Sequence, residues 1–176
     1  MTVPTSGTWS PVTALTASKP GDVDTTQKHA LGTVRVFKHP TYGEGEFIYL
    51  KGVASTAAGD AVSYNTTSWT TTRAAAGAGI PWAIAFATAA VDATTKFGWY
   101  QISGIAVGNK TKTVSMAAGI AVGISTTALI SASSSLKELL GAWVAVVGSA
   151  TTTTLGGDKI ILNIARGGAR LQGRIS

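Results

Sequence analysis

The chain has 176 residues, a net charge of +6 at pH 7 and no cysteine, and only 12% of its residues are charged. The absence of cysteine excludes disulfides, thiolate chemistry and cysteine-based metal sites. The longest apolar run, 141–150, is about half as long as a membrane-spanning helix, and the first residues lack the pattern of a signal peptide. We therefore expect no membrane partner. So low a charge content favours a surface that is partly covered by another molecule.

Residues 1–30 are predicted to form an extended arm. Pro4, Pro11 and Pro20 exclude a regular helix and disfavour a central strand. Trp9 and Leu15 are candidate anchors, because large apolar side chains are seldom left in water. Two alternatives stay open, an arm that becomes ordered on a neighbouring subunit and a frayed terminus.

Strand signals begin at residue 33. The segment 33–37 alternates apolar and polar residues, and 46–54 is apolar and rich in β-forming residues. The stretch 39–45 between them is dense in turn-forming residues. Short strands then continue at intervals of about eight to twelve residues, which is typical of a barrel or a sandwich. We therefore predict an all-β fold with a compact β-barrel or sandwich.

The chain repeats itself. Residues 57–69 return as 117–129, with seven of thirteen positions identical and no gap. Trp82 and Trp143 follow in the same order, which predicts that they are equivalent, buried core positions. One segment, 135–141, has helical signals instead: Ser135 and Glu138 form a capping-box pattern and Gly141 stands at a helix end. A strand leading into Trp143 competes with this helix.

These patterns predict three parts and an internal tandem duplication. Neither repeat has enough apolar surface for a core of its own, so we expect the two to share one. The predicted parts are the arm 1–30, a duplicated β domain 31–166 and a basic tail 167–176, the domain comprising units at about 46–96 and 97–155 and a closing strand at 157–166.

The titratable side chains form no recognisable catalytic or metal-binding motif. His29 and His39 lack the spacing of metal ligands. Glu44 and Glu46 could pair as acid and base, but a polar loop tip is the favoured interpretation. Asp60 lies in a Gly-Asp turn, where bonds to local backbone are its expected role. We expect no catalytic, cofactor-binding or metal-binding residues.

Three arginines end the chain without an acidic residue among them: Arg166, Arg170 and Arg174. They could contact phosphate or an acidic partner, and a solvated basic tail is the simpler alternative. Aromatic and basic residues are not interleaved along the chain, so no direct nucleic-acid binding is expected.

Several segments resemble the head-decoration (cement) proteins of tailed bacteriophages, namely 29–33, 46–54, 58–62, 98–104 and 140–143. The resemblance implies a β-clip-like body that forms a homotrimer on the outer surface of the virion and binds the major capsid protein. It also implies an arm that adds a strand to the shell. The implied contact residues are Val3, Trp9, Val12, Leu15, Arg166, Arg170 and Arg174.

Two other functions compete with capsid decoration. A tail, head-fibre or adhesion protein that binds host glycans predicts exposed aromatic side chains around Trp99 and Tyr100. A small enzyme requires converging acidic residues, whereas those of this chain are scattered over turns. We expect a structural protein of the virion and not an enzyme.

Overall fold

Alternating apolar residues separated by glycine turns produce β-strands throughout the chain. The computed structural model describes residues 10–11, 17–75, 82–111, 114–125, 128–133, 138–145, 159–166 and 169–172, and these contain no helix. All pairs between the named strands are antiparallel. The prediction of an all-β fold is therefore confirmed. The strands are β1 (Ser10–Pro11), β2 (Val34–His39), β3 (Gly43–Lys51), β4 (Ala61–Tyr64), β5 (Thr71–Arg73), β6 (Trp82–Ala87), β7 (Phe97–Gln101), β8 (Gly104–Asn109), β9 (Ala121–Ile124), β10 (Ile130–Ala132), β11 (Glu138–Val144), β12 (Lys159–Ile164) and β13 (Ala169–Gln172).

The strands form two units with the same topology. In the first unit the neighbours run β3, β7, β6, β4 and β5, and in the second they run β8, β12, β11, β9 and β10. Each unit also has one parallel bridge: Lys51 at the end of β3 pairs with Thr70 just before β5, and Lys110 just after β8 pairs with Ile130 in β10. The tandem repeat of the sequence is thus a repeat of structure.

Equivalent turns confirm the correspondence of the two units. The Gly59 N–H donates to the Ala87 carbonyl at 2.7 Å, and the Gly119 N–H donates to the Val144 carbonyl at 2.8 Å. Both glycines have positive φ, 92° and 79°, which explains why the Ala-Ala-Gly turn recurs.

The boundary between the units differs from the predicted one. Residues 97–101 were expected to open the second unit, but as β7 they pair with β3 and close the first unit. The strand that corresponds to β3 is β8, and the predicted closing strand is β12, an integral part of the second unit.

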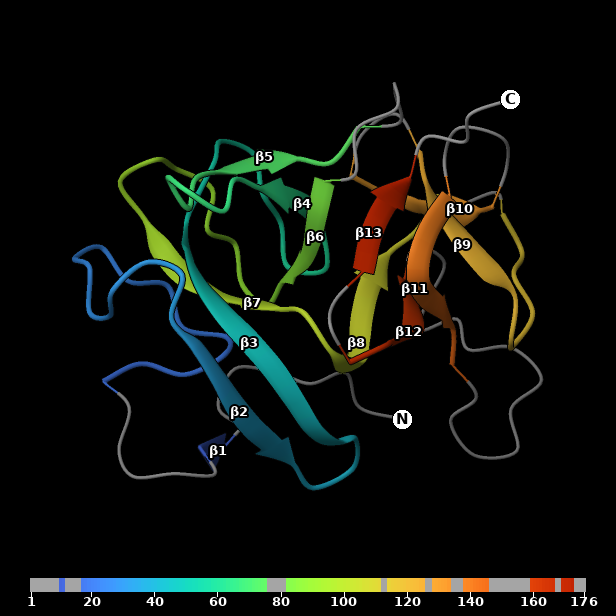
Figure 1. The fold of residues 1–176 in the computed structure, drawn as a ribbon, viewed down its shortest axis with the longest axis horizontal. Helices are drawn as coiled ribbons and strands as arrows, with labels where there is room; N and C mark the ends of the chain where they lie inside the picture. Colours follow the sequence, from blue (N-terminus) through green and yellow to red (C-terminus); the bar gives the residue numbers. More distant parts are fainter. Residues whose placement is uncertain are drawn as a thin grey trace.

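β13 joins the two units (Figure 1). It pairs with β6 of the first unit and with β11 of the second. The predicted tail 167–176 therefore contains a strand at the centre of the molecule. Its short, glycine-flanked sequence has little strand signal of its own, and pairing on both sides supplies the stability.

The units share the largest hydrophobic cluster. Ile84 and Phe86 of β6 belong to the same cluster as Val144 and Leu162 of the second unit. A smaller cluster fills the first unit, around Leu50 and the Tyr100 ring. The expectation of a shared core is confirmed by this packing, in which one face of β6 contacts the interior of the second unit.

β11 decides between the helix and the strand predicted as alternatives for 135–141, in favour of the strand over 138–141. Glu138–Val144 is a strand, so the helix proposed for 135–141 is wrong over 138–141, and 134–137 lie outside the described residues. Ala121 lies opposite Trp143 and Gly123 lies opposite Glu138. The two-residue step along β9 is thus matched by a five-residue step along β11, so β11 contains a bulge of three extra residues. Gly141 within this bulge has φ 79°. The positive φ required in this β-bulge explains the glycine at position 141, which does not mark the end of a helix.

The bulge also breaks the predicted equivalence of Trp82 and Trp143. Ala61 lies opposite Phe86 in the first unit, as Ala121 lies opposite Trp143 in the second, so the counterpart of Trp143 is Phe86. Trp143 is 38% exposed and is not a core residue. The side chain of Trp82 lies outside the described residues.

A glycine at the junction of the units provides a test of this packing. Gly104 has φ 86°, and a β-carbon there would lie 2.6 Å from the Glu44 carbonyl oxygen. Gly119 has φ 79° but no atom within 4 Å of such a carbon. We expect Gly119→Ala to lower the free energy of unfolding by about 1–2 kcal/mol through backbone strain, and Gly104→Ala to cost a further 1–3 kcal/mol or so through overpacking. Urea denaturation measures both, and equal losses would show that the units are not tightly apposed at Gly104.

Candidate binding surface

The first unit is covered by the segment 17–33. The Trp99 Nε1–H group donates to the backbone oxygen and hydroxyl of Ser18 at 3.1 and 3.0 Å. Asp24 forms a bridge with Phe97, and its carboxylate accepts a 2.7 Å bond from the Tyr49 hydroxyl. Residues 17–30 therefore belong to the folded body, which corrects the prediction of an arm that extends to residue 30.

Little of the predicted arm contact is described. Ser10 and Pro11, as β1, pair with β2 of the same chain. The predicted contact residues Val3, Trp9, Val12 and Leu15 lie outside the described residues.

The aromatic side chains proposed for sugar stacking are buried. Trp99 and Tyr100 are each 0% exposed. The Trp99 ring packs with Phe37 and Tyr49, with centroids 5.2 Å apart in both cases, and with His29 at 5.1 Å. Burial raises the pKa of both Tyr49 and Tyr100 well above 10. Trp99 and Tyr100 are therefore core residues, and not the exposed aromatic side chains that the glycan-binding alternative predicts.

His29 makes this covering sensitive to acid. Burial lowers the pKa of His29 below its ordinary value of 6.5, and the nearby cation of Arg35 lowers it further. The unfolded chain therefore binds a proton more tightly, and the contribution of neutral His29 to stability is fully present above pH 6.5 and is lost as the pH falls through the lowered pKa.

We expect the free energy of unfolding to decrease on acidification over this window, with a smaller decrease in His29→Phe. His39, whose pKa is also lowered by burial, accounts for part of the dependence in both proteins. Denaturation curves at a series of pH values measure the effect. Identical pH profiles for the wild type and His29→Phe would contradict it.

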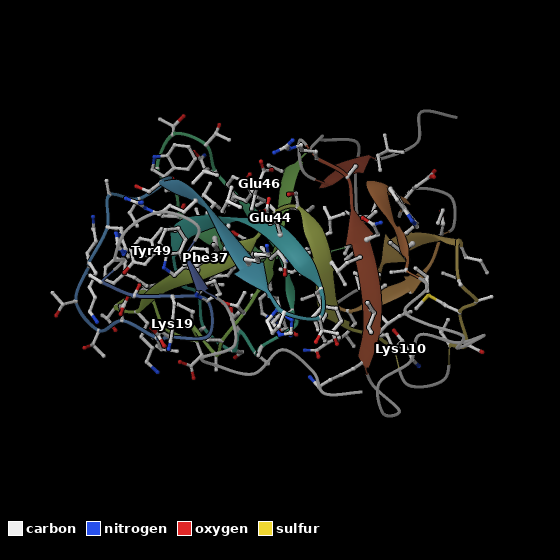
Figure 2. All side chains as sticks on the ribbon, turned by 90° about the horizontal axis from the view of Figure 1, so that it is seen from below. Lys19, Phe37, Glu44, Glu46, Tyr49 and Lys110 are labelled. Carbon is white, nitrogen blue, oxygen red and sulfur yellow. The ribbon has the colours of Figure 1, made fainter. Side chains whose placement is uncertain are left out.

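Glu44 and Glu46 lie near the junction of the two units (Figure 2). With Arg166 they line a pocket of about 300 Å³ between β3, the start of β8 and the end of β12. Arg166 contacts Glu46 at 3.5 Å but is 86% exposed, so this pair contributes little stability. The structure brings the two candidate acids together at the rim of a pocket, with a cation beside them.

Asp60 is a structural residue at the same junction. Its carboxylate accepts bonds from the Arg73 guanidinium at 3.1 Å and from the Asn109 amide at 2.8 Å. Asn109 belongs to β8, so this network crosses between the units. Among the described residues, no group of three or more His, Asp or Glu side chains could hold a metal ion.

The three C-terminal arginines do not form one described site. Arg166 is exposed after β12, Arg170 occupies a central position in β13, and Arg174 lies outside the described residues. The side chain of Arg170 is not described, but its backbone pairs with both Leu140 and Ala83. Arg170 is therefore part of the folded body and not of a solvated tail.

The equivalent outer faces of the two units differ in exposure. Phe86 and Ala61 are 1% and 0% exposed, whereas their counterparts Trp143 and Ala121 are both exposed. The Ala61 N–H donates to the Ala128 carbonyl of the second unit at 3.0 Å, so the second unit covers this face of the first.

Exposed apolar side chains lie in β9 and β11 or directly before β9, and Trp143 and Ala121 lie opposite each other. We call this set the β11 surface and define it by Ile120, Ala121, Leu140 and Trp143, of which the three large side chains are 42%, 43% and 38% exposed. This surface was not predicted from the sequence, because the repeat predicts that Trp143 lies in the core. Leu139, Ala142 and Val144 of β11 are buried whereas Leu140 and Trp143 are exposed, and because both sets are apolar the sequence does not distinguish them.

The chain has no match among the known proteins compared. No family model, curated protein or solved structure is similar to it. In the described part of the chain, no helix is long and apolar enough to cross a membrane.

Proposed function

We propose that this protein is a structural component of a bacteriophage virion that binds the outer surface of the capsid and stabilises it. The proposed partner is the major capsid protein, and the proposed assembly is a homotrimer. The observation that carries the proposal is the uncovered β11 surface on a body whose equivalent face is fully buried. Tryptophan is enriched in protein interfaces relative to the rest of the surface, and Trp143 is exposed here.

The construction of the body supports the same role. Two units fused by β13 and a shared core form a stiff block. The charged groups Asp24, Asp60 and Asp92 are each engaged in an ion pair with a nearby cation. Many copies of such a block, each with a modest interface, would resist the pressure of packed DNA through multivalency. The resemblance to head-decoration proteins adds to this argument.

Sedimentation of the purified protein with undecorated, expanded phage heads tests the proposal. We expect saturation near one copy per capsid subunit, with bound heads gaining resistance to heat. The absence of binding, or only a few copies per particle, would contradict capsid decoration and favour a tail or fibre protein. The glycan-binding alternative predicts exposed aromatic side chains around Trp99 and Tyr100, which are buried, and it would have to act through the exposed Trp143 instead.

A further inference from the structure

We propose that the β11 surface binds a protein surface that is both apolar and acidic. This inference deepens the proposed function and rests on it for the location of the partner, which is the capsid. The apolar part of the argument is the β11 surface itself, where Leu140 and Trp143 are 43% and 38% exposed. Tryptophan is among the residues that contribute most to protein interfaces.

The two halves of the chain differ in charge. Residues 1–101 contain seven basic and six acidic side chains, a net charge of +1, whereas 102–176 contain seven basic and two acidic ones, a net charge of +5. The two values sum to the +6 of the whole chain. The half that carries the β11 surface is therefore the strongly basic half.

Basic residues occupy the elements next to β11. Arg170 occupies the position on β13 opposite Leu140, and Lys159 and Arg166 begin and follow β12. β11 itself contains one acidic residue, the half-buried Glu138. A partner rich in carboxylates would be attracted to this side of the molecule and oriented on it.

The same charge argues against a second copy as the occupant. Two copies meeting through their β11 surfaces would bring together two halves of net charge +5, and like charges across an interface oppose binding. A single-stranded nucleic acid would suit the charge and could stack a base on Trp143, but it would leave the aliphatic Ile120 and Leu140 without a matching contact. An acidic protein surface with an apolar centre satisfies both features.

Trp143→Glu tests the surface, with Val34→Glu as its matched control. Val34 is 51% exposed on β2 of the first unit, so the control adds the same charge at an exposed apolar residue of the neutral half. Because both side chains are exposed, both variants should melt near the wild-type temperature. Leu140→Glu is a second test if Trp143→Glu melts early.

Binding is measured to undecorated heads and to two peptides, one alternating leucine with glutamate and one alternating leucine with lysine. We expect Trp143→Glu to weaken head binding about tenfold or more and Val34→Glu to leave it within about twofold. We also expect the acidic peptide to bind the wild type better than the basic one, and its binding to weaken with added salt.

The possible outcomes separate this inference from the proposed function. If wild type and Trp143→Glu bind heads equally, the inference is wrong and capsid binding stands. If the wild type ignores heads but binds the acidic peptide through Trp143, capsid decoration is wrong and the inference stands. The inference is also overturned if the acidic peptide does not distinguish Trp143→Glu from the wild type, if oligo(dT) binds better than the acidic peptide, or if Trp143→Glu alters only the oligomeric state in sedimentation.

Discussion

Replacing Trp99 by alanine is expected to lower the free energy of unfolding by about 3–5 kcal/mol, whereas Trp143→Ala should lower it by only about 1–2 kcal/mol. The two side chains have the same chemistry and both lie in strands. They differ in burial, since Trp99 is 0% and Trp143 is 38% exposed. The comparison therefore isolates the effect of packing.

The cost at Trp99 has two sources. The ring packs with Phe37, Tyr49 and His29, so its removal leaves a cavity among aromatic side chains that cannot collapse. The Nε1–H group also bonds to both oxygens of Ser18, and its loss leaves the buried Ser18 without that donor.

Guanidinium chloride denaturation of the wild type, Trp99→Ala, Trp99→Phe and Trp143→Ala measures these effects. Trp99→Phe keeps an aromatic ring but loses the N–H donor, so its loss of stability should fall between those of the other two variants. A large loss for Trp143→Ala together with a small one for Trp99→Ala would restore the sequence-based view that Trp143 is a core residue.

Repetition was predictable because turns have strict local requirements. The Ala-Ala-Gly sequence before β4 and β9 places Gly59 and Gly119 where positive φ is required, so the glycines and their neighbours recur in sequence as well as in structure. The all-β fold follows in the same way from short alternating segments. Local signals of this kind need no knowledge of distant partners.

The errors arose where distant pairing decides the outcome. The capping-box signal at Ser135 and Glu138 was a correct local pattern, but pairing of β11 with β9, β12 and β13 places 138–144 in a sheet. The three extra residues of β11 leave no mark in an alignment that matches Trp82 to Trp143. β13 was overlooked for the same reason, since its neighbours β6 and β11 are far from it in sequence.

The candidate surface could be predicted only in part. The charge asymmetry is a property of the sequence, but exposure of Trp143 depends on what covers each sheet face. The segment 17–30 was wrongly predicted to be a free arm, because its composition is polar and rich in proline. Its order comes from long-range bonds such as that between Ser18 and Trp99, which are 81 residues apart.

Asp60→Asn is expected to lower the free energy of unfolding by about 2–3 kcal/mol, because it changes a buried carboxylate that is hydrogen-bonded to several donors, while the partly exposed Arg73 left behind is still solvated. The Asp60 side chain is 2% exposed and pairs with Arg73 at 3.1 Å. The same carboxylate accepts from the Ala57 N–H and from Asn109, so an amide in its place also offers donors where only acceptors fit.

Asp92→Asn is the matched control, since Asp92 forms the 2.7 Å surface pair with Lys96 and both side chains are about a third or more exposed. It should cost less than about 1 kcal/mol. Arg73→Met in the Asp60→Asn background should recover part of the loss, because it removes the charge that the first substitution leaves unpaired. Equal losses for Asp60→Asn and Asp92→Asn would mean that the network does not hold the units together. In the second unit the position of Asp60 is occupied by Ile120, which is exposed. The Asp60 network therefore lies where the two units meet, and it has no counterpart on the face that we assign to the partner.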